Sequence, residues 1–533
     1  MSRAASDVPT LTWALAESPA FRARTDVAPP PEGFAALPER ALQFGTGALL
    51  RGLVEDAVDQ ANRRGAFNGR VVVVGSTGSG RDRAFADQDG LYTLAVQGTV
   101  GGEPVRELRV VGAVSRALSA VDEWDGVLAC ARNPHLAVIF SNTTEVGLAL
   151  DPDVDADRMD ARPPRSFPAK LARVLLERAR AFAFAPSKGV VVVPTELVED
   201  NGDRLRALVL ELADRWALGG GFARWVARDV AFCNTLVDRI VPGAPVGEAA
   251  DALGAATAYA DALLTTCEPY RLFAIEGNDA LRERLGFVAE GDESVFVTPD
   301  VGPFRERKVR LLNGTHTAMV PLALLAGCET VREAVRDPRL GAFVRRVMFR
   351  EIAPTLDQPG VDAYARAVLD RFDNAFIRHA LWDITLQGTT KLRVRVVPTI
   401  ARATAADGHA PGALTLGFAA HLWLLRGGLQ DERRAAGHAV PADHQGAAVR
   451  AHWDAVAGGD RPGDDALRVF GRAVCADTAL WGDDLTALPG FADAVASNLA
   501  RLRDRGAAGA LDTLLDAPAP LVATAPAPAL AGA

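Results

Sequence analysis

Runs of β-branched residues alternate with amphipathic segments from about residue 40 to about residue 240. The clearest runs lie at 70–75, 136–140 and 189–194, and their continuous apolar character is typical of strands buried on both faces. Strands that alternate with helices form a mostly parallel sheet with helices packed on it. This pattern predicts an α/β fold for the first half of the chain.

The first predicted strand ends in a glycine turn at Gly45 and Gly47 that leads directly into a helix. Dinucleotide sites use this arrangement, because backbone N–H groups at the helix start receive the pyrophosphate. Leu50 takes the place of the third glycine of GxGxxG, so the motif alone is weak, and an ordinary glycine-rich turn is the alternative. Arg51, one helical turn further on, is expected either to reach a phosphate or to lie in water.

Small polar residues follow the strand at 136–140, and we expect Asn142 and Thr143 to contact the ligand at the carboxyl end of the sheet. At the end of the strand at 70–75, no acidic residue occupies the position that would bind the ribose hydroxyls of the cofactor. Arg81 and Arg83 lie nearby and could accept a 2′-phosphate. NAD is therefore the preferred cofactor, and NADP stays open.

Helical periodicity dominates from residue 308 onwards, and its first stretch carries Lys308, Asn313 and His316. At about 100° per residue, Asn313 lies roughly 140° and His316 roughly 80° round from Lys308, so all three can face one cleft. A desolvated lysine has a lowered pKa and can take a hydroxyl proton, while amide and imidazole groups donate to an oxygen that gains charge. The trio suits alcohol oxidation or ketone reduction; a solvated lysine and a structural histidine are the alternative.

At 533 residues the chain is too long for one core. We predict a loose N-terminal extension (1–37), a dinucleotide-binding domain with linker (38–295), a predominantly helical substrate domain (296–516) and a mobile Pro/Ala-rich tail (517–533).

Charge and cysteine usage limit the partners and the compartment. The net charge of −9 without a long basic run argues against nucleic acid and anionic membranes. Five scattered cysteines, never spaced CxxC, indicate a reduced cytoplasmic protein without structural zinc or disulfides. No signal-peptide order and no run of 18 apolar residues is present. The oligomeric state is not predicted, and a monomer stays open.

Two other dehydrogenase classes do not fit the sequence. None of the four tyrosines is followed by lysine four residues later, which excludes a short-chain dehydrogenase mechanism. The histidines form no HxxxH or HExxH pair, which disfavours a zinc alcohol dehydrogenase and any catalytic metal.

Four ordered stretches resemble the polyol-specific long-chain dehydrogenases, the mannitol dehydrogenase family. They are residues 45–51, 141–145 and 234–240, and the Lys-x4-Asn-x2-His signature at 308–316. The resemblance covers roughly residues 38–515 and implies a Rossmann-type domain followed by a helical domain, with no metal. It also implies that Lys308 is the general acid and base and that Asn313 and His316 orient the reacting oxygen.

Within the family, the sequence looks most like the uronate-pathway branch, the tagaturonate reductases (altronate oxidoreductases). The similar stretches are 88–93, 196–202, 268–277, 311–318 and 391–398. This resemblance implies interconversion of D-altronate and D-tagaturonate with NAD(H) in the cytoplasm. Alternatives with the same chemistry are fructuronate with mannonate, or mannitol with fructose. A non-catalytic nucleotide sensor and a cofactor-free sugar-binding protein are alternatives of other classes.

A sugar acid needs a charge-assisted donor for its carboxylate. We favour Arg271 and Lys391, and the other candidates are Arg310, Arg378 and Arg393. Asn234 is expected either to border the substrate or to cap a local turn. Mannitol-type members tend to carry an arginine eight residues before the later lysine, whereas Asp383 precedes Lys391 here, which weakens a neutral-polyol assignment.

Overall fold

The computed structural model describes residues 8–75, 80–143, 147–456 and 461–516. The chain divides into two compact units, one of Met1–Gly98 with Pro104–Phe304 and one of Thr99–Glu103 with Arg305–Ala533. The predicted tail at 517–533 lies outside the described residues, as do parts of two expected ligand loops at 76–79 and 144–146.

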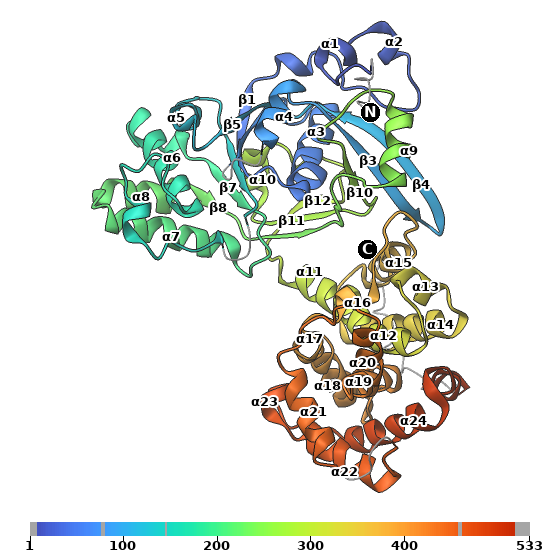
Figure 1. Cartoon of the computed structure of the whole chain (residues 1–533). Coiled ribbons are helices and arrows are strands. Elements are labelled where there is room, and N and C mark those ends of the chain that lie inside the picture. Colours follow the sequence, from blue (N-terminus) through green and yellow to red (C-terminus); the bar gives the residue numbers. More distant parts are fainter. Residues whose placement is uncertain (1–7, 76–79, 144–146, 457–460, 517–533) are drawn as a thin grey trace, which may run out of the picture. The chain divides into compact units, whose positions relative to one another are not determined.

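A six-stranded sheet forms the centre of the first unit (Figure 1). Its strands are β1 (Glu39–Phe44), β2 (Arg70–Gly75), β5 (Val114–Ser119), β6 (Val138–Ser141), β7 (Val191–Pro194) and β8 (Ala231–Phe232). They are all parallel and lie in the order β5-β2-β1-β6-β7-β8. This is the doubly wound Rossmann order, in which ligands bind at the carboxyl ends of the two central strands. The predicted α/β class is confirmed.

Side chains of the strands alternate between two apolar cores, one on each face of the sheet. Val72 and Val74 belong to one core with residues of the helices at 124–131, 167–181 and 201–215, while their neighbours face the other core. The helices and short helical turns of this unit are α1 (Trp13–Ala16), α2 (Pro19–Arg22), η1 (Phe34–Ala36), η2 (Leu50–Glu55), α3 (Asp56–Arg63), α4 (Arg81–Asp87), α5 (Trp124–Ala131), η4 (Val154–Asp157), α6 (Phe167–Ala181), η5 (Pro186–Lys188), α7 (Asn201–Arg215), α8 (Gly219–Asp229), α9 (Glu248–Thr257) and α10 (Asp279–Leu285). Burial on both faces explains why these strands read as continuous apolar runs.

Two three-stranded sheets complete the first unit. One has the order β10-β3-β4 and the other β12-β11-β9. Their strands are β3 (Tyr92–Val100), β4 (Glu103–Val111), β9 (Thr235–Asp238), β10 (Thr265–Cys267), β11 (Leu272–Glu276) and β12 (Val295–Thr298).

The N-terminal segment is held more firmly than the sequence suggested. Leu11, Phe21 and Val27 are buried in a core cluster with residues of β3 and β4. Backbone bridges join Thr10 to Ala260 and Ala28 to Arg109. The prediction of a loose extension is therefore corrected for residues 8–37, because their spaced apolar side chains cover a sheet.

Helices make up the described part of the second unit beyond residue 305 (Figure 1). They are α11 (Gly302–Arg307, which begins in the first unit), η6 (Lys308–Gly314), α12 (Thr315–Leu325), α13 (Val331–Arg336), α14 (Pro338–Arg346), η7 (Val347–Ile352), η8 (Ala353–Thr355), α15 (Val361–Phe372), α16 (Leu381–Ile384), α17 (Gly388–Arg395), α18 (Val397–Asp407), α19 (Gly412–Leu424), α20 (Gly428–Ala435), α21 (Gly446–Asp454), α22 (Asp464–Cys475), α23 (Thr478–Trp481), η9 (Leu485–Ala487) and α24 (Phe491–Asp516). α12 and α19 are apolar on all sides and pack at the centre of the unit.

Three helical segments of the described chain are π-helical, with backbone hydrogen bonds between residues five apart: η2 in the first unit, and η6 and η7 in the second. Such segments are rare and frequently occur at functional sites. η2 follows the glycine turn, and η6 carries the Lys308 and Asn313 signature.

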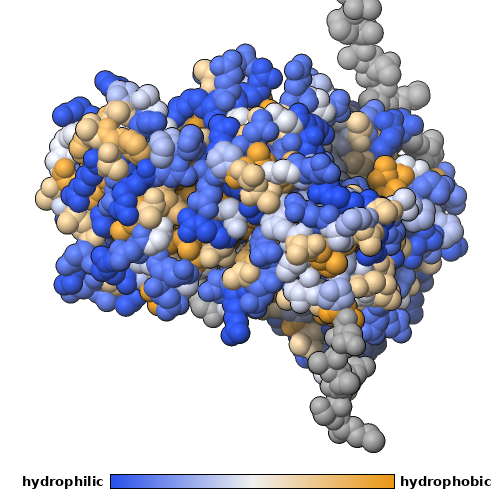
Figure 2. All heavy atoms as spheres, turned by 90° about the horizontal axis from the view of Figure 1, so that it is seen from above, coloured by the Kyte–Doolittle hydropathy of each residue, from blue (hydrophilic) through white to orange (hydrophobic). Residues whose placement is uncertain are grey.

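The face of the molecule in Figure 2 is mainly hydrophilic, and its hydrophobic residues form small scattered groups. Within the described ranges, no helix has both the length and the apolar character needed to cross a membrane.

Candidate active site

The glycine turn lies at the point where the strand order of the sheet reverses. Gly45 follows β1 and Asn142 follows β6, the neighbouring strand. Gly45 has φ +118°, and a Cβ atom there would lie 2.8 Å from Leu50 Cδ1 and 3.0 Å from the Asn142 carbonyl oxygen. Only glycine fits this position.

Gly47 has a different environment from Gly45. A Cβ atom built on Gly47 would have no heavy atom within 4 Å, so the space above this residue is open in the protein alone. A tight turn, open space at its second glycine and a helix start are what a pyrophosphate needs. The residues of the turn therefore fit a dinucleotide.

Arg51 supports the turn from inside the protein. Its side chain is buried, and it donates hydrogen bonds to the Thr46 carbonyl at 2.7 Å and to Thr265 Oγ1 at 2.7 Å. The alternative position in water is wrong because the side chain is buried, and the contact of Arg51 with a phosphate stays a prediction. Thr265 lies 214 residues away in the sequence, so no local pattern could have indicated this partner.

Asn142 and Thr143 lie at the same sheet edge and contact residues that follow β7. The Asn142 amide donates to the Thr195 carbonyl at 2.9 Å. The backbone N–H and the hydroxyl of Thr143 donate to Glu196 Oε1 at 2.9 and 3.1 Å. Burial raises the pKa of Glu196. Sequence reasoning gave Glu196 no role, although an acidic residue directly after a buried strand could have been noticed.

The part of the chain that would decide between NAD and NADP is only partly described. Arg81 and Arg83 begin α4, directly after residues 76–79. Arg83 lies 3.8 Å from Asp87 in an exposed ion pair.

In the second unit, Lys308 begins η6, Asn313 lies near its end, and His316 lies in the first turn of α12. The expected α-helical angles do not apply to residues 308–314, because the segment is π-helical. Residues five apart are one turn apart in a π-helix, and residues three apart are neighbours on an α-helix. Lys308, Asn313 and His316 therefore lie along one side of the continuous helix.

The His316 ring is fixed between two other rings. It stacks on Phe372 with centroids 4.1 Å apart and an interplanar angle of 21°. The His379 ring packs edge-on at 5.1 Å. Nε2 of His316 is buried without a hydrogen-bond partner. Sequence reasoning missed Phe372 and His379, because both lie more than 50 residues from His316.

His316 is neutral at physiological pH. Its pKa lies well below the usual value, first because of burial and then because of the His379 ring and the charges of Arg371, Arg395 and Lys391. A neutral imidazole with an unpartnered nitrogen can donate to a substrate oxygen.

Lys391 lies on α17, and its Nζ donates to the Ile384 carbonyl at 3.0 Å. Burial, and then the charge of Arg395, lowers the pKa of Lys391. The side chain lines a small pocket together with Thr317 and His421.

Asn234 belongs to the framework of the first unit. Its Oδ1 accepts from the N–H groups of Gly202 and Asp203, both at 3.1 Å, at the start of α7. Its amide donates to the Asp203 carboxylate at 3.0 Å. Asn234 therefore binds the start of a helix that lies 31 and 32 residues away in the sequence, and not a local turn. A contact of Asn234 with the substrate stays a prediction.

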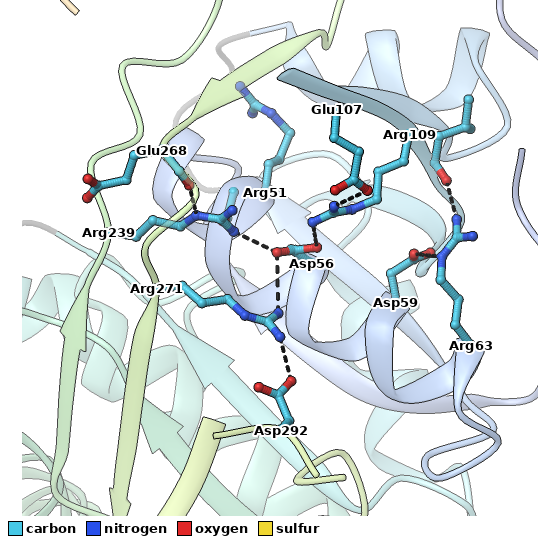
Figure 3. A network of polar contacts seen from close by, with 12 residues as sticks. Arg51, Asp56, Asp59, Arg63, Glu107, Arg109, Arg239, Glu268, Arg271 and Asp292 are labelled. Carbon is cyan, nitrogen blue, oxygen red and sulfur yellow. Dashed lines mark hydrogen bonds and ion pairs between the residues drawn. The ribbon is translucent and has the colours of Figure 1, made fainter. Parts of the chain in front are cut away.

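Arg271 is part of a buried ion network around Asp56 (Figure 3). It lies 2.5 Å from Asp292 and 3.4 Å from Asp56, so its guanidinium is already matched by carboxylates. These ion pairs support a structural role for Arg271, and its contact with substrate stays a prediction.

Asp56 is fully buried and is surrounded by three arginines, as Figure 3 shows. Arg109 and Arg239 each lie 2.6 Å from its carboxylate, and Arg271 is the third. Burial alone would raise the pKa of Asp56, but the arginine charges outweigh it and hold the pKa well below its usual value. The network joins α3 to β4 and to the residues directly after β9 and directly before β11, and it is structural.

Within the described ranges, His, Cys, Asp and Glu side chains form no group of three that could hold a metal ion.

Two family profiles match most of the chain. The Mannitol dehydrogenase Rossmann domain matches residues 39–287, and the Mannitol dehydrogenase C-terminal domain matches residues 300–503. The chain is 39% identical to an altronate oxidoreductase of Bacillus subtilis (strain 168) over 477 residues, which are 89% of this chain and 95% of that protein. It is 39% identical to one of Klebsiella pneumoniae (strain 342) over 480 residues, or 90% and 97% of the two chains.

Solved structures show the same fold. A Pseudomonas fluorescens mannitol 2-dehydrogenase in ternary complex with NAD and D-mannitol has a TM-score of 0.64 at 24% identity, covering 93% of this chain and 98% of that one. A substrate-free D-sorbitol dehydrogenase has a TM-score of 0.74 at 23% identity, covering 94% and 100%.

Proposed function

The chain belongs to the mannitol dehydrogenase family, and on this premise we propose that it is an NAD-dependent oxidoreductase that interconverts D-altronate and D-tagaturonate. The observation that carries the proposal is 39% identity to altronate oxidoreductases over about nine-tenths of the chain. Its own residues supply a dinucleotide turn and an acid/base helix, both of which this reaction needs.

The glycine turn and the helix start after it would hold the cofactor. Backbone N–H groups near Gly47 would receive the pyrophosphate in the open space at that residue, while Arg51 keeps the turn in place through the Thr46 carbonyl. Bound NAD supplies the acceptor for the hydride of the alcohol carbon.

The helix that begins at Lys308 would supply the group that transfers the proton. In the oxidation, the Lys308 amine accepts the proton of the substrate hydroxyl, and in the reduction the ammonium returns it. The neutral His316 ring donates from Nε2 to the same oxygen, and the Asn313 amide donates beside it. These donors stabilise the negative charge that develops on oxygen as the C–H bond breaks.

The rings around His316 support this role. Phe372 and His379 restrict the imidazole to one orientation, so the hydrogen bond to substrate costs little ordering free energy. The low pKa of His316 keeps the ring neutral, and its proton on Nε2 is then available as a donor without adding a charge.

The five cysteines are free thiols, as a reducing compartment would keep them, and we place the enzyme in the cytoplasm. A panel of altronate, mannonate, mannitol and arabinitol, each with NAD and with NADP, tests the assignment at the nicotinamide absorbance band. The proposal expects the highest kcat/KM for altronate with NAD. A higher value for mannonate or mannitol would move the assignment to another branch of the family.

A further inference from the structure

Arg395 stands out among the positive groups near His316 because it has no acidic partner. Within the described ranges, no carboxylate pairs with its guanidinium, and only burial shifts its pKa, which is lowered. Two neighbouring arginines have polar partners. Arg310 donates hydrogen bonds to the carbonyls of Val394 and Arg395, and Arg402 forms an ion pair with Glu306 at 2.5 Å. A half-buried, unmatched arginine is costly to keep without an anion.

The backbone places Arg395 against the acid/base helix. A Cβ atom on Gly314 would lie 3.3 Å from the Arg395 carbonyl oxygen, and Gly314 lies directly between Asn313 and Thr315. Arg310, inside η6, holds the same carbonyl at 3.2 Å. The end of α17 is thus fixed to the segment that carries the reacting groups.

Lys391 and Arg395 occupy one face of α17, because residues four apart are neighbours on a helix. The charges of both act on His316 and lower its pKa. No acidic side chain is among the main electrostatic influences on that ring. The surroundings of His316 are therefore positive, which suits an anionic substrate better than a neutral polyol.

We propose that Arg395 binds the carboxylate of the sugar acid and thereby makes this site select an acid over the corresponding polyol. The inference rests on the proposed function and adds the residue that determines specificity. A guanidinium can bind a carboxylate through two parallel N–H···O bonds, and Lys391 adds a second positive charge on the same face.

The test compares Arg395→Gln and Arg395→Lys with Arg393→Gln as the matched control. Arg393 has the same side chain on the same helix, but it is exposed, so we no longer count it among the candidates for binding the carboxylate. Each protein is assayed with altronate and with altritol, the polyol in which the carboxylate is reduced to an alcohol; altritol is followed as a substrate or as a competitive inhibitor. NADH affinity and the melting temperature are measured on every variant.

We expect Arg395→Gln to lower kcat/KM for altronate about 100-fold. For altritol, kcat/KM or the inhibition constant should change less than about two-fold. Arg395→Lys keeps the charge but loses the two-pronged geometry, so a loss of about 10-fold is expected. Arg393→Gln should match the wild type. Equal losses for altronate and altritol, or no loss with altronate, would overturn the inference.

Failure of the proposed function is recognised separately, in the wild-type protein. If the wild type oxidises mannonate rather than altronate, the same variants are assayed with mannonate and mannitol, and the inference stands or falls on that pair. If the wild type oxidises only neutral polyols, both proposals are refuted.

Discussion

Lys308 and Asn313 lie one turn apart in the π-helical segment η6, five residues from each other. In an α-helix the same spacing would rotate the two side chains roughly 140° apart. The wider turn places them on one side, and the return to α-helix at Thr315 adds His316 to that side. On the proposed function, the π-helical segment would let the lysine, the amide and the imidazole contact the same substrate oxygen.

The two glycines of the turn are expected to respond differently to alanine. Gly45→Ala introduces a Cβ atom 2.8 to 3.0 Å from Leu50 and Asn142 at a positive φ, so it should destabilise the first unit by about 1 to 3 kcal/mol. Gly47→Ala meets no protein atom and should leave the free protein as stable as wild type while weakening NADH binding at least about ten-fold. Thermal melts and fluorescence titration with NADH measure the two effects. Unchanged NADH affinity in Gly47→Ala would show that the dinucleotide does not bind at this turn.

The ion network around Asp56 should be essential for stability. Asp56→Asn leaves three buried arginines without their central charge, and we expect a loss of about 3 to 5 kcal/mol in urea unfolding. Asp26→Asn breaks the ion pair of an exposed carboxylate with Arg24 in the same unit and should change the stability far less, because water screens the pair. Similar costs for the two variants would show that burial of the network is unimportant.

Much of the fold could be predicted because it depends on local patterns. The β-branched runs become buried parallel strands, and the glycine turn occurs where the strand order reverses. The docking of the N-terminal segment was missed, because Leu11 and Phe21 are isolated apolar residues whose partners lie on β3 and β4.

The candidate site was only partly predictable. The proposed catalytic trio is a local signature, but the partners of Arg51 and Arg271 are 214 and 215 residues away. Both arginines were assigned to ligands, because a sequence shows a charge without showing which carbonyl or carboxylate matches it. The π-helical geometry was also missed, since it arises from packing and not from residue preference.

Lowering the pH should destabilise the fold of the second unit, because its buried histidines resist protonation. The pKa of His421 is lowered to about 4, mainly by burial, and that of His316 is lowered as well. The unfolded chain binds these protons near pH 6.5, so the stabilisation is complete above that pH and is lost as pH falls towards 4. His421 alone should contribute roughly 2 kcal/mol of the difference between pH 7.5 and pH 5.

Urea unfolding at the two pH values measures this effect in wild type and in His421→Gln, which cannot titrate but can still hydrogen-bond to Thr389, the present partner at 3.0 Å. The variant should lose less stability on acidification. An identical pH dependence in both proteins would exclude His421 as its source.

Phe372 should affect catalysis only by holding the His316 ring in its orientation. Phe372→Leu removes the stacked ring and should lower kcat about ten-fold with little change in NADH affinity, because the imidazole loses its fixed orientation. Phe376→Leu, a change at an exposed phenylalanine nearby, is the control. Equal kcat values for the two variants would contradict a positioning role.

The central claim is that the Lys308 amine carries the proton, and steady-state kinetics of Lys308→Ala tests it most directly, with NADH affinity measured on the same sample and Lys188→Ala as control. The account predicts that kcat for altronate oxidation falls at least about 1000-fold while NADH affinity stays within about three-fold of wild type. A kcat within about ten-fold of wild type would contradict it.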